Sequence, residues 1–133
     1  MSRAKPCVVV IFLICVITPL WSASPVIKAT KTIKDQAGNL GTTAVFTPTA
    51  DGVYRVSVYI SATAGTGSGN GQVGFVDDSE NAQSLTTFLG FFVGAPGSFS
   101  FPIKAKANHP ITIGTYSVSS SLTYNVYVVV ESL

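Results

Sequence analysis

Apolar and polar residues alternate with a period of two along most of the chain after residue 25. The clearest case is residues 53–62, where Arg55, Ser57 and Tyr59 lie opposite an apolar stripe. That stripe consists of Tyr54, Val56, Val58, Ile60 and Ala62. Residues 98–107 and 122–131 repeat the pattern. Because successive side chains of a β-strand point to opposite faces, the alternation predicts strands with one buried face.

Shorter segments of the same kind complete the predicted set of strands. They are residues 26–34, 42–48, 72–77, 85–93 and 111–116. Turn residues separate them, and the glycine-rich run at 64–71 (AGTGSGNG) is predicted to be a flexible loop. Eight short strands without a helical period predict an all-β fold, an eight-stranded antiparallel jelly-roll sandwich over residues 25–133.

The first 24 residues have the layout of a secretory signal peptide. Arg3 and Lys5 precede an apolar run over residues 7–21, and small residues follow at 22–24. A retained membrane anchor is the alternative, but fifteen residues span only about 22 Å as a helix. We therefore expect cleavage near residue 24, no membrane insertion afterwards, and a secreted, extracellular or cell-envelope location. Cys7 and Cys15 would leave with the signal, so no disulfide is expected in the mature domain.

The mature chain is close to neutral. Loss of Arg3 and Lys5 reduces the eight basic residues to six, which equals the six acidic residues. A protein that binds nucleic acid carries a basic face, so a nucleic-acid partner is not expected.

Catalytic and metal-binding residues are sparse. His109 is the single histidine and lies between Asn108 and Pro110 in a predicted turn, so we expect no catalytic residues, no enzyme activity and no cofactor. The acidic residues Asp77, Asp78 and Glu80 are the densest group of oxygen ligands and form a weak candidate for calcium. We expect a solvated loop rather than a metal site.

One motif resembles a known family. Phe46, Gly52 and Tyr54, followed by apolar Val56 and Val58, are similar to half of the signature of complement-type globular heads. Those heads belong to the superfamily of tumour necrosis factor, and the resemblance implies a trimeric jelly roll with Phe46, Gly52 and Tyr54 at a structural corner. Because Gly52 follows Asp51 at the turn, we expect a positive φ there.

Apolar side chains also occur on strand faces that should be polar. They are Tyr59, Tyr127, Val129, Phe88 and Phe92. A contiguous apolar patch marks an interface, and Tyr59, Tyr127 and Val129 are predicted to form the contact of a homotrimer. The leading hypothesis is a non-enzymatic exported module that presents its loops to an extracellular protein or glycan ligand. The alternatives are a monomeric carbohydrate-binding module and a structural subunit of an appendage or virion-like particle.

Overall fold

The computed structural model describes residues 24–133, except for the side chains of residues 85–89. The predicted signal peptide therefore lies almost entirely outside the described residues. The described chain forms the strands β1 (Val26–Ala37), β2 (Thr43–Phe46), β3 (Gly52–Ala64), β4 (Ser68–Val76), β5 (Ala82–Phe92), β6 (Gly97–Ala105), β7 (Ile111–Tyr116) and β8 (Thr123–Ser132). Residues 24–133 contain no helix that is long and apolar enough to cross a membrane.

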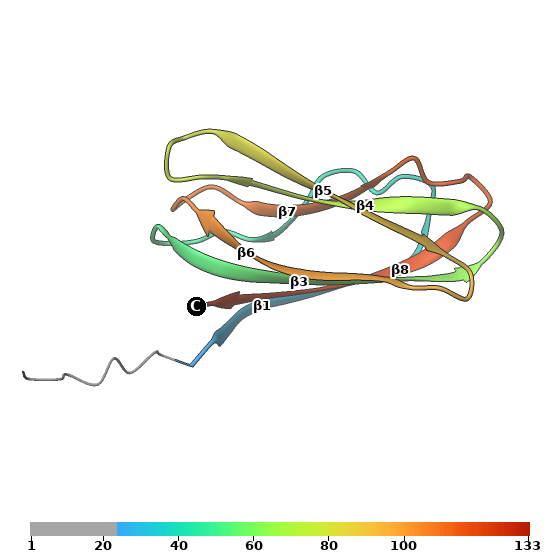
Figure 1. The fold of residues 1–133 in the computed structure, drawn as a ribbon, viewed down its shortest axis with the longest axis horizontal. Coiled ribbons are helices and arrows are strands. Elements are labelled where there is room, and N and C mark those ends of the chain that lie inside the picture. The colour runs from blue at the N-terminus through green and yellow to red at the C-terminus, as the bar shows by residue number, and fades with distance from the viewer. Residues whose placement is uncertain (1–23) are drawn as a thin grey trace, which may run out of the picture.

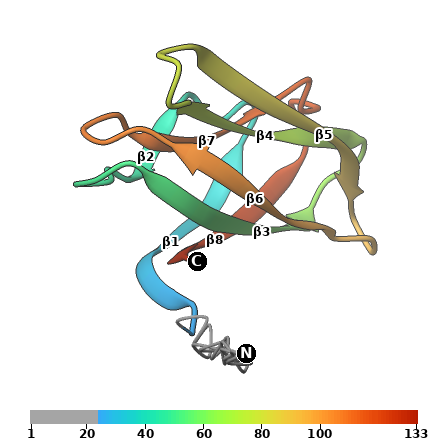
Figure 2. The same cartoon turned by 60° about the vertical axis from the view of Figure 1, so that its left-hand side comes forward.

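The strands form two antiparallel sheets that lie face to face (Figure 1). One sheet has the order β1-β8-β3-β6 and the other the order β2-β7-β4-β5. The antiparallel pairs are β1 with β8, β2 with β7, β3 with β6 and β4 with β5. This pairing, with two Greek-key motifs, is the topology of a jelly roll. The prediction of an all-β jelly-roll sandwich is confirmed. Figure 2 shows β2 and β5 at opposite edges of the second sheet.

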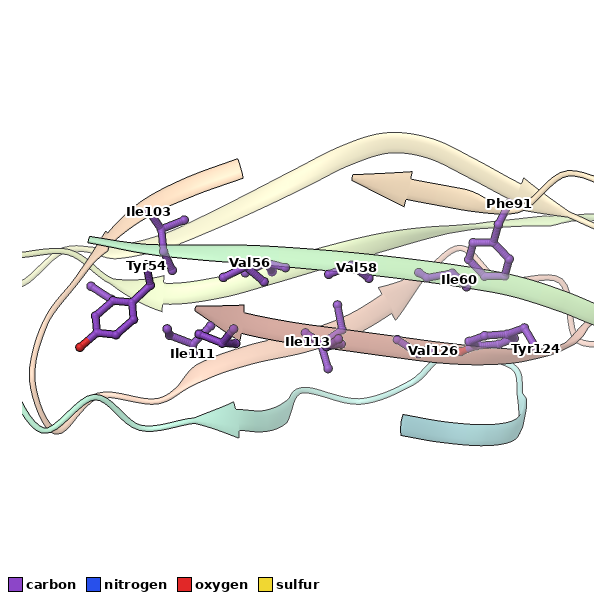
Figure 3. Close-up of a cluster of buried hydrophobic side chains, with 14 of the residues drawn as sticks. Tyr54, Val56, Val58, Ile60, Phe91, Ile103, Ile111, Ile113, Tyr124 and Val126 are labelled. Atoms are coloured by element: carbon purple, nitrogen blue, oxygen red, sulfur yellow. The ribbon is translucent and has the colours of Figure 1, made fainter. Parts of the chain in front are cut away.

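The core lies between the sheets and consists of the stripes that alternate along the strands. Tyr54, Val56, Val58 and Ile60 stand in line along β3 (Figure 3). Ile111 and Ile113 of β7 face them from the other sheet, and Phe91 and Tyr124 close one end with ring centroids 4.9 Å apart. Burial of these apolar side chains, at about 1.5–3 kcal/mol each, is the main force that holds the two sheets together.

The glycine-rich run at 64–71 is mostly strand, contrary to the prediction of a loop. β4 begins at Ser68, and Gly69 and Gly71 are buried on its inner face. A Cβ atom at Gly69 would lie 2.6 Å from Phe91, and one at Gly71 would lie 2.8 Å from Ile60. These glycines are therefore small residues that a crowded core requires, while Gly65, with a φ of 92°, makes the turn before β4.

Two of the three residues of the predicted corner are in contact. Phe46 and Tyr54 pack with ring centroids 5.7 Å apart, and the Tyr54 hydroxyl donates to the Ala50 carbonyl at 3.1 Å. Gly52 is the first residue of β3, and its φ lies outside the left-handed region, so the expected positive φ is wrong. A Cβ atom at this position would lie 3.3 Å from the Tyr54 ring, so the tight space beside the ring favours glycine there.

Candidate functional site

The outer surface of the β1-β8-β3-β6 sheet brings the three predicted interface residues together. Tyr59 of β3 lies directly across from Tyr127 of β8, and Ser57 lies across from Val129 one step further along. The two tyrosine rings are 5.9 Å apart between centroids and tilted by 49°. Residues opposite one another on antiparallel strands share a face, so β3 and β8 hold this group in fixed register. We call the surface around Tyr59, Tyr127 and Val129 the tyrosine face.

Strand β6 supplies serine hydroxyls beside the tyrosines. Ser98 pairs with Tyr59 and Ser100 with Ser57, and the hydroxyls of Ser57 and Ser100 are 2.8 Å apart. Together these side chains line a shallow hollow of about 500 Å³. Tyr59 keeps 43% of its surface exposed and Tyr127 keeps 37%. The tyrosine face therefore combines accessible rings with neutral hydrogen-bonding groups, and its serines did not stand out in the sequence.

An ion pair closes one end of the tyrosine face. Arg55 of β3 lies across from Glu131 of β8, with the guanidinium Nε 2.7 Å from the carboxylate Oε2. The hydrogen bond from Arg55 lowers the pKa of the Glu131 carboxyl below its ordinary value, so the pair is charged at neutral pH. Because the two charges satisfy each other, this end of the face carries no net charge.

Exposed apolar residues concentrate on this one sheet. Among the described side chains, the exposed large hydrophobic residues are Val26, Ile27, Val53, Tyr59, Phe92, Val93, Tyr127 and Leu133. All but Phe92 and Val93 belong to β1, β3 or β8 or directly follow β8. Phe92 and Val93 lie apart, at the turn between β5 and β6, and the side chain of Phe88 lies outside the described set. Most of the exposed large hydrophobic residues among the described side chains therefore lie on the first sheet.

The acidic loop between β4 and β5 uses its carboxylates to hold the loop itself. Asp77 accepts hydrogen bonds from the backbone N–H groups of Ser79 and Asn81, at 2.9 and 3.0 Å, and from the Gln83 amide at 2.7 Å. These bonds lower the pKa of the Asp77 carboxyl, and the one from the Asn81 N–H contributes most to the shift.

The other two acids of the loop are paired with lysines from the chain around the end of β6. Asp78 forms an ion pair with Lys104, and Glu80 forms one with Lys106. Within residues 24–133, no three histidine, cysteine, aspartate or glutamate side chains form a group that could hold a metal ion. The three carboxylates that made the weak calcium candidate thus have separate protein partners instead of a common centre.

His109, the one residue considered for catalysis, is exposed in the loop between β6 and β7. The loop turns at Asn108, whose φ is 62°. Asn108 donates its backbone N–H to the Pro48 carbonyl at 2.8 Å. His109 is thus placed at a solvent-exposed turn, away from the tyrosine face on the outer side of β3, β6 and β8.

No protein-family model matches the chain, and no curated protein matches it in sequence. Solved structures with a similar arrangement of strands have low sequence identity. The xylan-binding domain from Paenibacillus barcinonensis Xyn10C is 12% identical, with a TM-score of 0.45, over 82% of this chain and 80% of that one. The capsid of Helicobacter pylori bacteriophage KHP30 gives 13% identity and a TM-score of 0.45, over 84% and 89% of the two chains.

A third similar structure is that of the Bacillus endospore appendages, described as disulfide-linked pili. It is 10% identical, with a TM-score of 0.42, over 98% of this chain and 96% of that chain. With all three TM-scores below 0.5, these likenesses assign no function and no partner to the chain. Membership of the complement-type family, inferred from residues 46–58, stays a prediction.

Proposed function

We propose that the chain is a non-enzymatic exported module that assembles as a homotrimer through the tyrosine face and presents its loops to an extracellular ligand. The observation that supports this most is the pair of exposed tyrosines, Tyr59 and Tyr127, on the β1-β8-β3-β6 sheet, which also carries most of the described exposed apolar residues. Subunit interfaces combine an apolar, aromatic centre with a polar margin. On this sheet, the serines of β6 and the Arg55–Glu131 pair supply such a margin.

A second copy of the chain suits this surface better than a charged partner. The Arg55–Glu131 pair at its margin is internally neutralised, so this pair adds no like-charge repulsion between identical faces. Closed cyclic assembly would also remove the apolar face from solvent, whereas a monomer would leave it exposed. The threefold symmetry itself rests on the resemblance of residues 46–58 to complement-type heads.

Two further parts of the proposal rest on the sequence. Export and a secreted or envelope location rest on the basic, apolar and small-residue layout of residues 1–24. That the module is non-enzymatic also rests on the sequence, in which His109 is the single histidine and lies in an exposed turn.

A carbohydrate-binding monomer is the second candidate. It is favoured by the paired tyrosine rings beside the hydroxyls of Ser57, Ser98 and Ser100, because sugars combine apolar faces with hydroxyl groups. A structural subunit of an appendage or particle is the third candidate, and it would use the same face in open-ended association. All three candidates use this face, and they differ in the mass of the protein in solution.

Tyr127→Lys tests the proposal, because it places a charge at the centre of the tyrosine face. We expect light scattering to show monomers for this variant and trimers for the wild type, since a buried unpaired lysine opposes association. Ala82→Lys adds the same charge at an exposed position of β5 in the other sheet and should leave the mass unchanged. A Tyr127→Lys protein that keeps the wild-type mass would show that the tyrosine face is not the interface.

A further inference from the structure

The outer surface of the second sheet has a hollow of its own, of about 370 Å³. Its floor is formed by Gly74 of β4 and Gly114 of β7, which alternate with the buried Val73 and Ile113 and so face outward. We call this hollow the glycine groove. Its other described lining residues are Asn39, Leu40, Gly41, Thr42, Gln72, Gln83, Ser84, Thr112 and Thr115.

The two floor glycines lie where neighbouring protein atoms leave little room for a side chain. They lie on neighbouring strands in successive rows, because Gly74 pairs with Thr112 and Gln72 pairs with Gly114. A Cβ atom at Gly74 would lie 2.7 Å from the Thr112 hydroxyl, and one at Gly114 would lie 3.3 Å from the Leu40 carbonyl. Neither glycine has a φ in the left-handed region. Glycine weakens a strand interior, and it often marks a place where another molecule approaches the backbone.

One wall of the groove is held by a buried hydrogen-bond network. Thr115 accepts a hydrogen bond from the Leu40 N–H at 2.7 Å, and its hydroxyl lies 2.6 Å from that of Tyr124. Tyr124 in turn donates to the Gly38 carbonyl at 2.8 Å. The Thr115 N–H also donates to the Leu40 carbonyl at 3.0 Å. The segment from residue 38 to residue 42 is thus fixed against β7, and the groove is formed before any ligand arrives.

The opposite wall presents an oriented amide group. The Gln72 side chain donates from Nε2 to the Ser84 hydroxyl at 2.5 Å. This bond sets the orientation of the amide, and no described residue donates to its carbonyl oxygen, which can act as an acceptor. Gln83 pairs with Phe75, which packs against the core, so it contributes its backbone to this wall and its side chain lies on the other face of the sheet.

The lining chemistry selects a class of ligand. The described lining residues are amides, hydroxyls, glycines and one leucine, and none of them is charged. A phosphate would need cationic groups, and a nucleobase would need an aromatic surface on which to stack. A neutral ligand rich in hydroxyl groups matches an oriented carbonyl acceptor and threonine and serine hydroxyls.

We propose that the glycine groove is a binding site for a neutral saccharide unit. Its volume of about 370 Å³ lies within the range of about 300–1,000 Å³ typical of small-molecule sites. The groove belongs to the sheet opposite the tyrosine face, so this site does not depend on assembly. In a trimer closed through the tyrosine face, the outer side of the second sheet would stay accessible to a glycan.

The test is a titration of the folded domain with cellohexaose, xylohexaose and maltohexaose at millimolar concentrations, followed by NMR of the backbone amides. We expect at least one of these sugars to shift the amides of Gly74, Thr112 and Gly114. The variant Gln72→Ala should bind that sugar roughly fivefold more weakly, because one hydrogen-bond acceptor is lost. Asn70→Ala, on the same face of β4 outside the groove, is the matched control and should bind like the wild type.

Failure of this proposal can be told apart from failure of the assembly proposal. Tyr127→Lys should keep the wild-type sugar affinity whatever its mass in solution. If none of the three sugars shifts the groove amides, the saccharide site is wrong. It is also wrong if the shifts map to Tyr59 and Tyr127 instead, or if Gln72→Ala, with wild-type amide dispersion, binds with unchanged affinity.

Discussion

Removal of one hydroxyl, by Tyr124→Phe, tests the buried network that holds the groove wall. The ring would keep its packing against Phe91, so the change isolates the polar contacts. Two hydrogen bonds disappear, one with Thr115 at 2.6 Å and one to the Gly38 carbonyl at 2.8 Å. At about 0.5–1.5 kcal/mol for each net bond, the free energy of unfolding should fall by roughly 1–3 kcal/mol.

Urea denaturation measures this loss, with every variant at one protein concentration because assembly also contributes to stability. Each 1 kcal/mol corresponds to a fall of roughly 4–8 °C in Tm for a domain of up to about 100 residues. Tyr116→Phe is the control, because the described structure gives the Tyr116 hydroxyl no hydrogen bond and its loss should cost little. An unfolding free energy for Tyr124→Phe within about 0.5 kcal/mol of the wild type would refute the network, because that is the usual range of surface substitutions.

Two other predictions concern the corner and the acidic loop. Tyr54→Ala should lower the free energy of unfolding by roughly 3–5 kcal/mol, because it leaves a cavity beside Phe46. Tyr54→Phe should cost less, because it loses only one hydrogen bond. Equal melting curves for the two variants would contradict this prediction. Hydrogen bonds lower the Asp77 pKa from its ordinary value of 3.8, so their stabilisation is present above that pH and is lost as the pH falls through the lower folded value. The free energy of unfolding should therefore fall less steeply with decreasing pH in Asp77→Asn than in the wild type. Identical pH dependence of the two proteins would show that the Asp77 hydrogen bonds do not stabilise the loop.

The sequence predicted the sheets well because their signal is local. Alternation over residues 53–62 is the signature of a strand with one buried face, and β3 runs from Gly52 to Ala64 with that stripe in the core. The same alternation identified Tyr59, Tyr127 and Val129 as outward-facing, and the jelly-roll pairing then brought them together. Each of these inferences needed only the period of two and the order of strands.

The features that the sequence did not predict depend on residues far apart in the chain. Gly69 and Gly71 look like loop residues until Phe91 and Ile60 are seen to occupy the space beside them. The glycine groove combines the segment at 39–42 with β4, β5 and β7, and no local pattern marks that combination. The hydrogen bond from Tyr124 to the Gly38 carbonyl likewise joins residues 86 positions apart.

The mass of the mature wild-type protein in solution tests the central claim most directly. Light scattering across a dilution series, from high to low micromolar, should give three times the mass of the mature chain at the upper end. A stable monomer throughout the series would contradict assembly through the tyrosine face and favour the carbohydrate-binding monomer. A mass that keeps growing with concentration would contradict closed symmetry and favour a polymerising subunit.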